Sequence, residues 1–225
     1  MKLDREQLIR ELTEEKIIVI VRGYTGDTLI SLAEAMWQGG IRFLEVTYDH
    51  GGSIGAEETA EDIRRLVTHF QGRMHIGAGT VLTCEEVEST FRAGGEYIIS
   101  PNVNVEVIRK TRELGMLSLP GALTPSEVQT AHEAGADFVK LFPVSSLGAD
   151  YVKAIKAPLC HIRMLAVGGI DEGNMAAYLR AGVSGFGIGS NIVNKKMIAS
   201  GDFAGITELA RAFIASLQAA MEAAK

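Results

Sequence analysis

Residues 138–143 read Phe-Val-Lys-Leu-Phe-Pro, an apolar run of strand length that holds one lysine. A run of this kind, rich in aromatic and β-branched residues, predicts a strand buried on both faces. Burying an unpaired ammonium costs on the order of several kcal/mol, so Lys140 needs an explanation. It either reaches water from the end of the strand or is held as a free amine, which attacks carbonyl groups and forms Schiff bases.

Strands and helices alternate along the whole chain around this run. The expected strands are residues 16–21, 43–48, 75–81, 97–101, 117–120, 138–143, 163–169 and 185–190. The expected helices are residues 4–14, 27–38, 56–70, 84–93, 104–113, 124–135, 148–156, 173–180 and 203–223. Asp27 or Thr28 is the expected N-cap of the second helix. Thr124-Pro125-Ser126-Glu127 is a strong helix start, because proline suits the first turn.

This alternation requires parallel strands joined by crossover helices. Several helices end at a glycine, which adopts the left-handed conformation easily, and an apolar strand follows two or three residues later. Eight such units predict an α/β fold, a single (β/α)8 TIM barrel with an N-terminal helix. An open doubly wound sheet is the alternative. The length of 225 residues fits one barrel domain over residues 1–225, and two small domains are the other way to divide it.

The composition is that of a globular protein, with 47% hydrophobic and 22% charged residues. The net charge of −6 argues against nucleic acid as a partner but allows a locally positive pocket for a small anion. No signal peptide and no run of about 18 apolar residues is visible, so no membrane association is expected. Cys84 and Cys160 show no disulfide pattern and indicate a reduced, cytoplasmic location.

Polar residues fall at the carboxyl ends of the expected strands, where barrels carry their active sites. They are Arg22, Glu45, Thr80, Lys140, Gly168, Gly169 and Ser190. Glu45 lies between two apolar residues, so alternation points its side chain into the barrel. There it needs a partner, and the Lys140 amine about 3 Å away would serve. The two form either a structural ion pair or a catalytic pair. A buried ion pair adds little stability, which favours the catalytic reading.

Two glycine turns follow consecutive strands, Gly168-Gly169 and then Gly187-Ile188-Gly189-Ser190. Phosphate sites in barrels are commonly built from the backbone N–H groups of these two loops. The pair of turns therefore predicts an anion site at the barrel mouth.

Four other residues are weaker candidates. Pro101 is expected to end a strand. Phe142 lies on the same strand face as Lys140 and forms either an apolar wall beside the amine or ordinary core. Asp49 and His50 follow the second strand and can enter the pocket. The five histidines show no metal-ligand spacing, so no metal is expected.

In order and together, the motifs of this chain resemble the 2-keto-3-deoxy-6-phosphogluconate (KDPG) and 4-hydroxy-2-oxoglutarate (KHG) aldolases over nearly its whole length. They are VIVRG at 19–23, FLEVT at 43–47, IGAGTVL at 76–82, ISP at 99–101, LPG at 119–121, FVKLFP at 138–143, GGI at 168–170 and GIGS at 187–190. The resemblance implies a class I aldolase that cleaves a 4-hydroxy-2-oxo acid such as KDPG. The products are pyruvate and an aldehyde, either glyceraldehyde 3-phosphate or glyoxylate.

The resemblance also implies roles for single residues. Lys140 is the expected Schiff-base lysine and Glu45 the expected general acid/base. Arg22 and Thr80 are expected to hold the pyruvyl carboxylate. The remaining expected contacts are Pro101 and Phe142, which line the site, and Gly168, Gly169, Gly189 and Ser190, which bind a phosphate or the distal polar end of the substrate. The expected assembly is a homotrimer, and no metal or organic cofactor is implied.

Three features differ from the family pattern. Asp49 stands where arginine or asparagine is frequent, Val167 stands where threonine is common, and residues 50–55 are unlike the usual loop. An aspartate at this place is expected to repel a substrate carboxylate or phosphate, so the substrate is less determined than the chemistry. Two other functions stay open. One is an epimerase or metal-dependent aldolase acting on sugar phosphates, and the other is a non-catalytic protein that binds an oxo acid.

Overall fold

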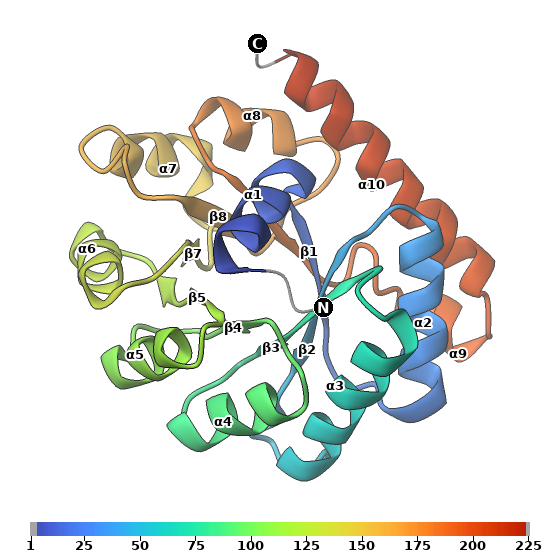
Figure 1. Ribbon diagram of the computed structural model, residues 1–225. Coiled ribbons are helices and arrows are strands. Elements are labelled where there is room, and N and C mark those ends of the chain that lie inside the picture. Colours follow the sequence, from blue (N-terminus) through green and yellow to red (C-terminus); the bar gives the residue numbers. More distant parts are fainter. Residues whose placement is uncertain (1–3, 224–225) are drawn as a thin grey trace.

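The computed structural model describes residues 4–223, whose strands form a nearly closed barrel inside a ring of helices (Figure 1). The strands are β1 (Ile17–Val21), β2 (Phe43–Thr47), β3 (His75–Gly79), β4 (Tyr97–Ile99), β5 (Leu117–Leu119), β6 (Gly121–Ala122), β7 (Val139–Leu141), β8 (Met164–Val167) and β9 (Gly185–Ile188). All pairs are parallel, in the order β5-β4-β3-β2-β1-β9-β8-β7-β6. The barrel expected from the sequence is confirmed, and the open sheet is excluded.

The helices lie outside the strands, except for the first (Figure 1). They are α1 (Arg5–Glu15), α2 (Gly26–Gln38), α3 (Ala56–Phe70), α4 (Cys84–Arg92), α5 (Val105–Glu113), α6 (Pro125–Ala134), α7 (Gly148–Lys156), α8 (Met175–Arg180), α9 (Lys195–Ala199) and α10 (Phe203–Ala223). The short helix α9 was not expected from the sequence. None of the helices in residues 4–223 combines the length and apolarity that crossing a lipid bilayer requires.

The fifth strand is divided into two pieces, where the sequence predicted one strand over 117–120. β5 pairs with β4, and β6 pairs with β7. Pro120 lies between the pieces and has no N–H to donate to a ladder. Its carbonyl oxygen still accepts the Lys140 amide hydrogen bond at 2.9 Å. The barrel therefore closes around Pro120, with one half of the strand bonded to each neighbour.

Two helix starts show what the sequence could and could not predict. α6 begins as expected, with a capping box between Thr124 and Glu127 and proline in the first turn. α2 begins earlier than expected, since its N-cap is Thr25 rather than Asp27 or Thr28. The Gly26 amide donates to the Asp62 carboxylate of α3 at 2.9 Å, and this contact between helices fixes the first turn.

The barrel interior is filled by apolar side chains, because alternate residues of each strand point inward. These residues and three from α1 form one cluster: Leu8, Ile9, Leu12, Ile18, Phe43, Tyr97, Ile99, Leu117, Leu119, Phe138, Leu165 and Val167. A larger apolar layer lies between the strands and the outer helices. Polar side chains inside the barrel are therefore exceptions that need a reason.

Helix α1 closes the amino-terminal end of the barrel. Arg5 forms an ion pair with the buried Asp137. Glu11 contacts His75 Nε2 at 2.8 Å, and Glu96 contacts His75 Nδ1 at 2.8 Å. Burial lowers the pKa of His75, but its two carboxylate partners outweigh this and raise the pKa above its usual value. With this end covered, the carboxyl ends of the strands form the open mouth.

Candidate active site

Lys140 lies in the middle of β7 and is buried, with 8% of its surface exposed. The sequence allowed two arrangements, and the one in which the Lys140 side chain extends into solvent is not observed. The amine nitrogen lies 4.9 Å from the centroid of the Phe142 ring. Phe142 is 38% exposed, so it belongs to the edge of the mouth rather than to a closed apolar wall.

Glu45 points into the barrel from β2 and is 1% exposed. Burial raises the pKa of its carboxyl, and the charges of Lys140 and Arg22 lower it by less. Within residues 4–223 its Oε2 atom has no hydrogen-bond partner. The protonated form is therefore favoured more than in an exposed glutamate.

The direct Lys140–Glu45 ion pair expected at about 3 Å is absent among the residues described here. The carboxylate instead leans over Gly79 of β3, where an added Cβ atom would lie 1.7 Å from Glu45 Oε1. The Lys140 amine lies near the Phe142 ring instead. Gly79 is thus a site residue that sequence reasoning missed, although its place in the glycine-rich 76–82 motif was a signal.

Arg22 and Thr80 lie together at the mouth, as the sequence predicted. The Arg22 guanidinium Nη2 donates to Thr80 Oγ1 at 2.8 Å. His50 Nε2 contacts the Thr80 carbonyl oxygen at 2.8 Å, so the loop after β2 also reaches this point. Three segments that are distant in sequence therefore meet at Thr80.

Asp49 lies in the loop after β2, where its carboxylate is held by local hydrogen bonds. Its carboxylate accepts hydrogen bonds from the Ser53 hydroxyl and from the amides of Gly51, Ser53 and Ile54. These bonds, that of the Ser53 hydroxyl foremost, lower the pKa of Asp49 to about 2. The Asp49 carboxylate therefore stabilises the conformation of its own loop.

Pro101 follows β4, as expected, and lies beside β6. A Cβ atom at Gly121 would lie 2.4 Å from the Pro101 carbonyl oxygen, so glycine permits this close approach. The Ser100 hydroxyl donates to the Val81 carbonyl oxygen at 2.7 Å and ties this strand end to the loop after β3.

The two glycine turns enclose a cavity of about 230 Å³ at the ends of β8 and β9. Its lining residues are Ile20, Phe142, Val167, Gly168, Gly169, Ile170, Gly187, Ile188, Gly189, Ser190 and Asn191. Gly168 and Gly169 have φ of 98° and 72°, conformations that other residues adopt rarely. All four residues predicted for the distal end of the substrate thus line one cavity, and Phe142 connects it to Lys140.

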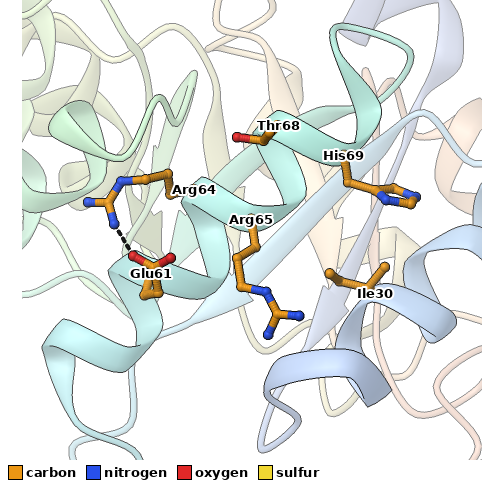
Figure 2. A pocket seen from close by; sticks show the side chains of 6 residues that line it. All are labelled: Ile30, Glu61, Arg64, Arg65, Thr68 and His69. Atoms are coloured by element: carbon orange, nitrogen blue, oxygen red, sulfur yellow. Dashed lines mark hydrogen bonds and ion pairs between the residues drawn. The ribbon is translucent and has the colours of Figure 1, made fainter.

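A second hollow, of about 430 Å³, lies on the outside of the barrel between α2 and α3 (Figure 2). Its two arginines already have partners, since Arg64 pairs with Glu61 and Arg65 pairs with Asp27. In residues 4–223 no three His, Cys, Asp or Glu side chains converge as metal ligands do. The barrel mouth is therefore the candidate active site.

Comparison with known proteins points to one family. A family model described as KDPG and KHG aldolase matches residues 8–209. The 2-dehydro-3-deoxy-6-phosphogalactonate aldolase of Escherichia coli K12 is 36% identical over 181 residues, which cover 80% of this chain and 85% of that protein. The 2-dehydro-3-deoxy-phosphogluconate aldolase of Haemophilus influenzae is 30% identical over 216 residues, which cover 95% and 98%.

Solved structures agree. A structure described as native KDPGal superposes with a TM-score of 0.82 at 34% identity, covering 92% of this chain and 96% of that one. KDPG aldolase from Legionella pneumophila, with pyruvate captured as a covalent carbinolamine intermediate, superposes with a TM-score of 0.82 at 27% identity, covering 95% and 99%. The match to the family model, the sequence identity with these relatives and the matching barrel together show that the chain belongs to the KDPG and KHG aldolase family.

Proposed function

We propose that the chain is a class I aldolase that cleaves a 2-keto-3-deoxy-6-phospho sugar acid to pyruvate and glyceraldehyde 3-phosphate through an imine on Lys140. One observation carries the proposal: a buried amine and a buried carboxyl of raised pKa face the same mouth without neutralising each other in an ion pair. Such a separation leaves a place between them for a carbonyl carbon.

The first half of the reaction builds the imine. Lys140, as the free amine, adds to the C2 ketone and forms a carbinolamine. Burial raises the pKa of the Glu45 carboxyl, so this group can hold a proton and donate it to the departing hydroxyl. Water leaves, and the protonated imine becomes an acceptor for an electron pair.

The second half breaks the carbon–carbon bond. The Glu45 carboxylate takes the proton of the C4 hydroxyl, the C3–C4 electron pair moves into the imine, and the aldehyde leaves. Glu45 returns the proton to C3 of the enamine. Water then hydrolyses the imine, which releases pyruvate and restores the Lys140 amine.

The two ends of the substrate are held by different parts of the mouth. Arg22 and Thr80 bind the carboxylate next to C2, because a guanidinium and a hydroxyl are both suited to carboxylate oxygens. The cavity between the glycine turns receives the phosphate. The size of that cavity and its four lining glycines, whose backbone N–H groups can approach an anion, favour a phosphorylated sugar acid over the shorter 4-hydroxy-2-oxoglutarate.

The test is reductive trapping. Borohydride added with pyruvate is expected to leave a stable carboxyethyl group on the peptide that contains Lys140, and Lys140→Ala is expected to abolish both trapping and pyruvate release. Lys153→Ala is the matched control, since this exposed lysine of α7 has no part in the mechanism. Full activity in Lys140→Ala would refute the imine.

We further propose that the chain assembles as a homotrimer and works in the cytoplasm. The family resemblance supports the trimer, and two cysteines that are both free support a reduced compartment. The mass of the particle in solution, from light scattering, would distinguish a trimer from a monomer or dimer.

A further inference from the structure

The backbone of Thr80 has an unusual conformation at the edge of the barrel mouth. Among residues 4–223, positive φ occurs at three non-glycine positions, Lys16, Gln71 and Thr80. The first two end helices α1 and α3, where the left-handed conformation is common. Thr80 has a φ of 56° directly after a strand, and a β-branched residue in this region is strained. Surrounding contacts must hold it there.

Two hydrogen bonds hold Thr80, one at its side chain and one at its backbone carbonyl. The Arg22 guanidinium donates to the side-chain oxygen at 2.8 Å. His50 Nε2 lies 2.8 Å from the carbonyl oxygen. A carbonyl can only accept, so Nε2 of His50 carries the hydrogen in this contact.

The histidine is itself held in place by neighbouring groups. Asp49 accepts four hydrogen bonds within its loop and so fixes the backbone next to His50. Glu86 Oε1 lies 3.5 Å from His50 Nε2. The other oxygen of Glu86 accepts from the amides of Leu82 and Thr83 at the start of α4. His50 therefore links the loop after β2 to the turn after β3.

We propose that His50 is a positioning residue for the carboxylate end of the substrate, acting through Thr80. This inference rests on the proposed function, in which Arg22 and Thr80 bind that carboxylate. Without the bond from His50, Thr80 relaxes out of its left-handed conformation and its hydroxyl moves away from Arg22. The guanidinium then loses its fixed orientation, and the carboxylate is bound less tightly.

The experiment compares two ketones in the borohydride reaction. Pyruvate carries the carboxylate, whereas acetone forms an imine with a lysine but has none. In His50→Ala, the pyruvate concentration for half-maximal trapping is expected to rise about tenfold, equivalent to about 1.4 kcal/mol. Trapping with acetone is expected to stay unchanged, because Lys140 and Glu45 are untouched. A rise in KM with little change in kcat should appear in the retro-aldol assay.

Two further variants separate positioning from general damage. His50→Gln keeps an N–H donor at a similar reach and is expected to recover most of the pyruvate affinity. His69→Ala removes a histidine of comparable exposure, 35% against 39%, that contacts Glu34 outside the barrel, and is expected to behave as wild type. Unchanged melting temperatures check that all three variants fold.

The outcomes distinguish this inference from the proposed function. If wild-type protein gives no adduct on Lys140, the proposed function fails. If wild type is trapped but His50→Ala needs no more pyruvate than wild type, only the role of His50 is overturned. An equal loss with pyruvate and acetone, or no recovery in His50→Gln, would also overturn it.

Discussion

Gly79→Ala tests how the position of Glu45 is set. The added Cβ atom would lie 1.7 Å from Oε1, 2.3 Å from Cδ and 2.5 Å from Cγ of Glu45. Non-bonded heavy atoms normally stay about 3.5 Å or more apart. The carboxyl group must therefore move by about 2 Å, since β3 is bonded to strands on both sides and cannot retreat.

The displacement acts on both activity and stability. A reacting group misplaced by about 1 Å can lose about 100-fold in rate, so kcat is expected to fall at least about 100-fold. Forcing a methyl group into a packed interior typically destabilises a protein by about 1–3 kcal/mol. Pyruvate release measures the first effect, and urea unfolding measures the second.

Two other glycines supply the controls. Gly39→Ala introduces a similar clash outside the barrel, 2.4 Å from the Cβ atom of Ala210 in α10, so it should lose comparable stability while kcat changes little. Gly55→Ala adds a methyl group in open space and should leave kcat unchanged, with a loss of only about 0.5–1 kcal/mol because alanine is a poorer N-cap for α3 than glycine. A folded Gly79→Ala protein with wild-type kcat would refute the argument that this glycine places the carboxyl.

Two further predictions concern stability. The pKa of His75 is raised in the folded state, so the stabilisation it provides is complete below pH 6.5 and is lost as the pH rises through the folded pKa. Urea unfolding across this range should show that slope in wild type and not in His75→Gln. Tyr97→Phe removes a buried hydroxyl that makes no well-formed hydrogen bond within residues 4–223, although the backbone of Leu44 and Gly77 lies near it, so the free energy of unfolding should rise by up to about 1 kcal/mol. A fall instead would indicate that an enclosed water satisfies the hydroxyl.

Periodicity predicted the barrel because the relevant signals are local. An apolar strand, a helix and a closing glycine recur along the whole chain. A chain that alternates in this way can bury its strands only by pairing them in parallel beneath the helices. Contacts between distant segments were not predictable in this way. Asp62 of α3 fixes the start of α2 through a hydrogen bond. Pro120 separates β5, which pairs with β4, from β6, which pairs with β7.

The same distinction applies to the site. Alternation along β2 correctly pointed Glu45 into the barrel, because a strand fixes side-chain direction. It could not show that the carboxyl leans over Gly79 instead of reaching the amine. The loop after β2 has no periodic pattern from which side-chain directions could be predicted. The four local hydrogen bonds that hold the Asp49 carboxylate in this loop were therefore not predictable.

The closed end of the barrel and its reactive end are physically linked. Glu45 carries a raised pKa because water does not reach it, and its burial depends on what lies beneath as well as at the mouth. The layer below contains Phe43 and Tyr97, and α1 covers that layer with Leu12. The ion pair of Arg5 with Asp137 and the Glu11–His75 contact hold α1 in place. If α1 did not cover the amino-terminal end of the barrel, water could reach the Glu45 carboxyl and its pKa would return towards the ordinary value. The charged pairs that hold α1 therefore help to set the proton affinity of Glu45, although they lie far from the substrate.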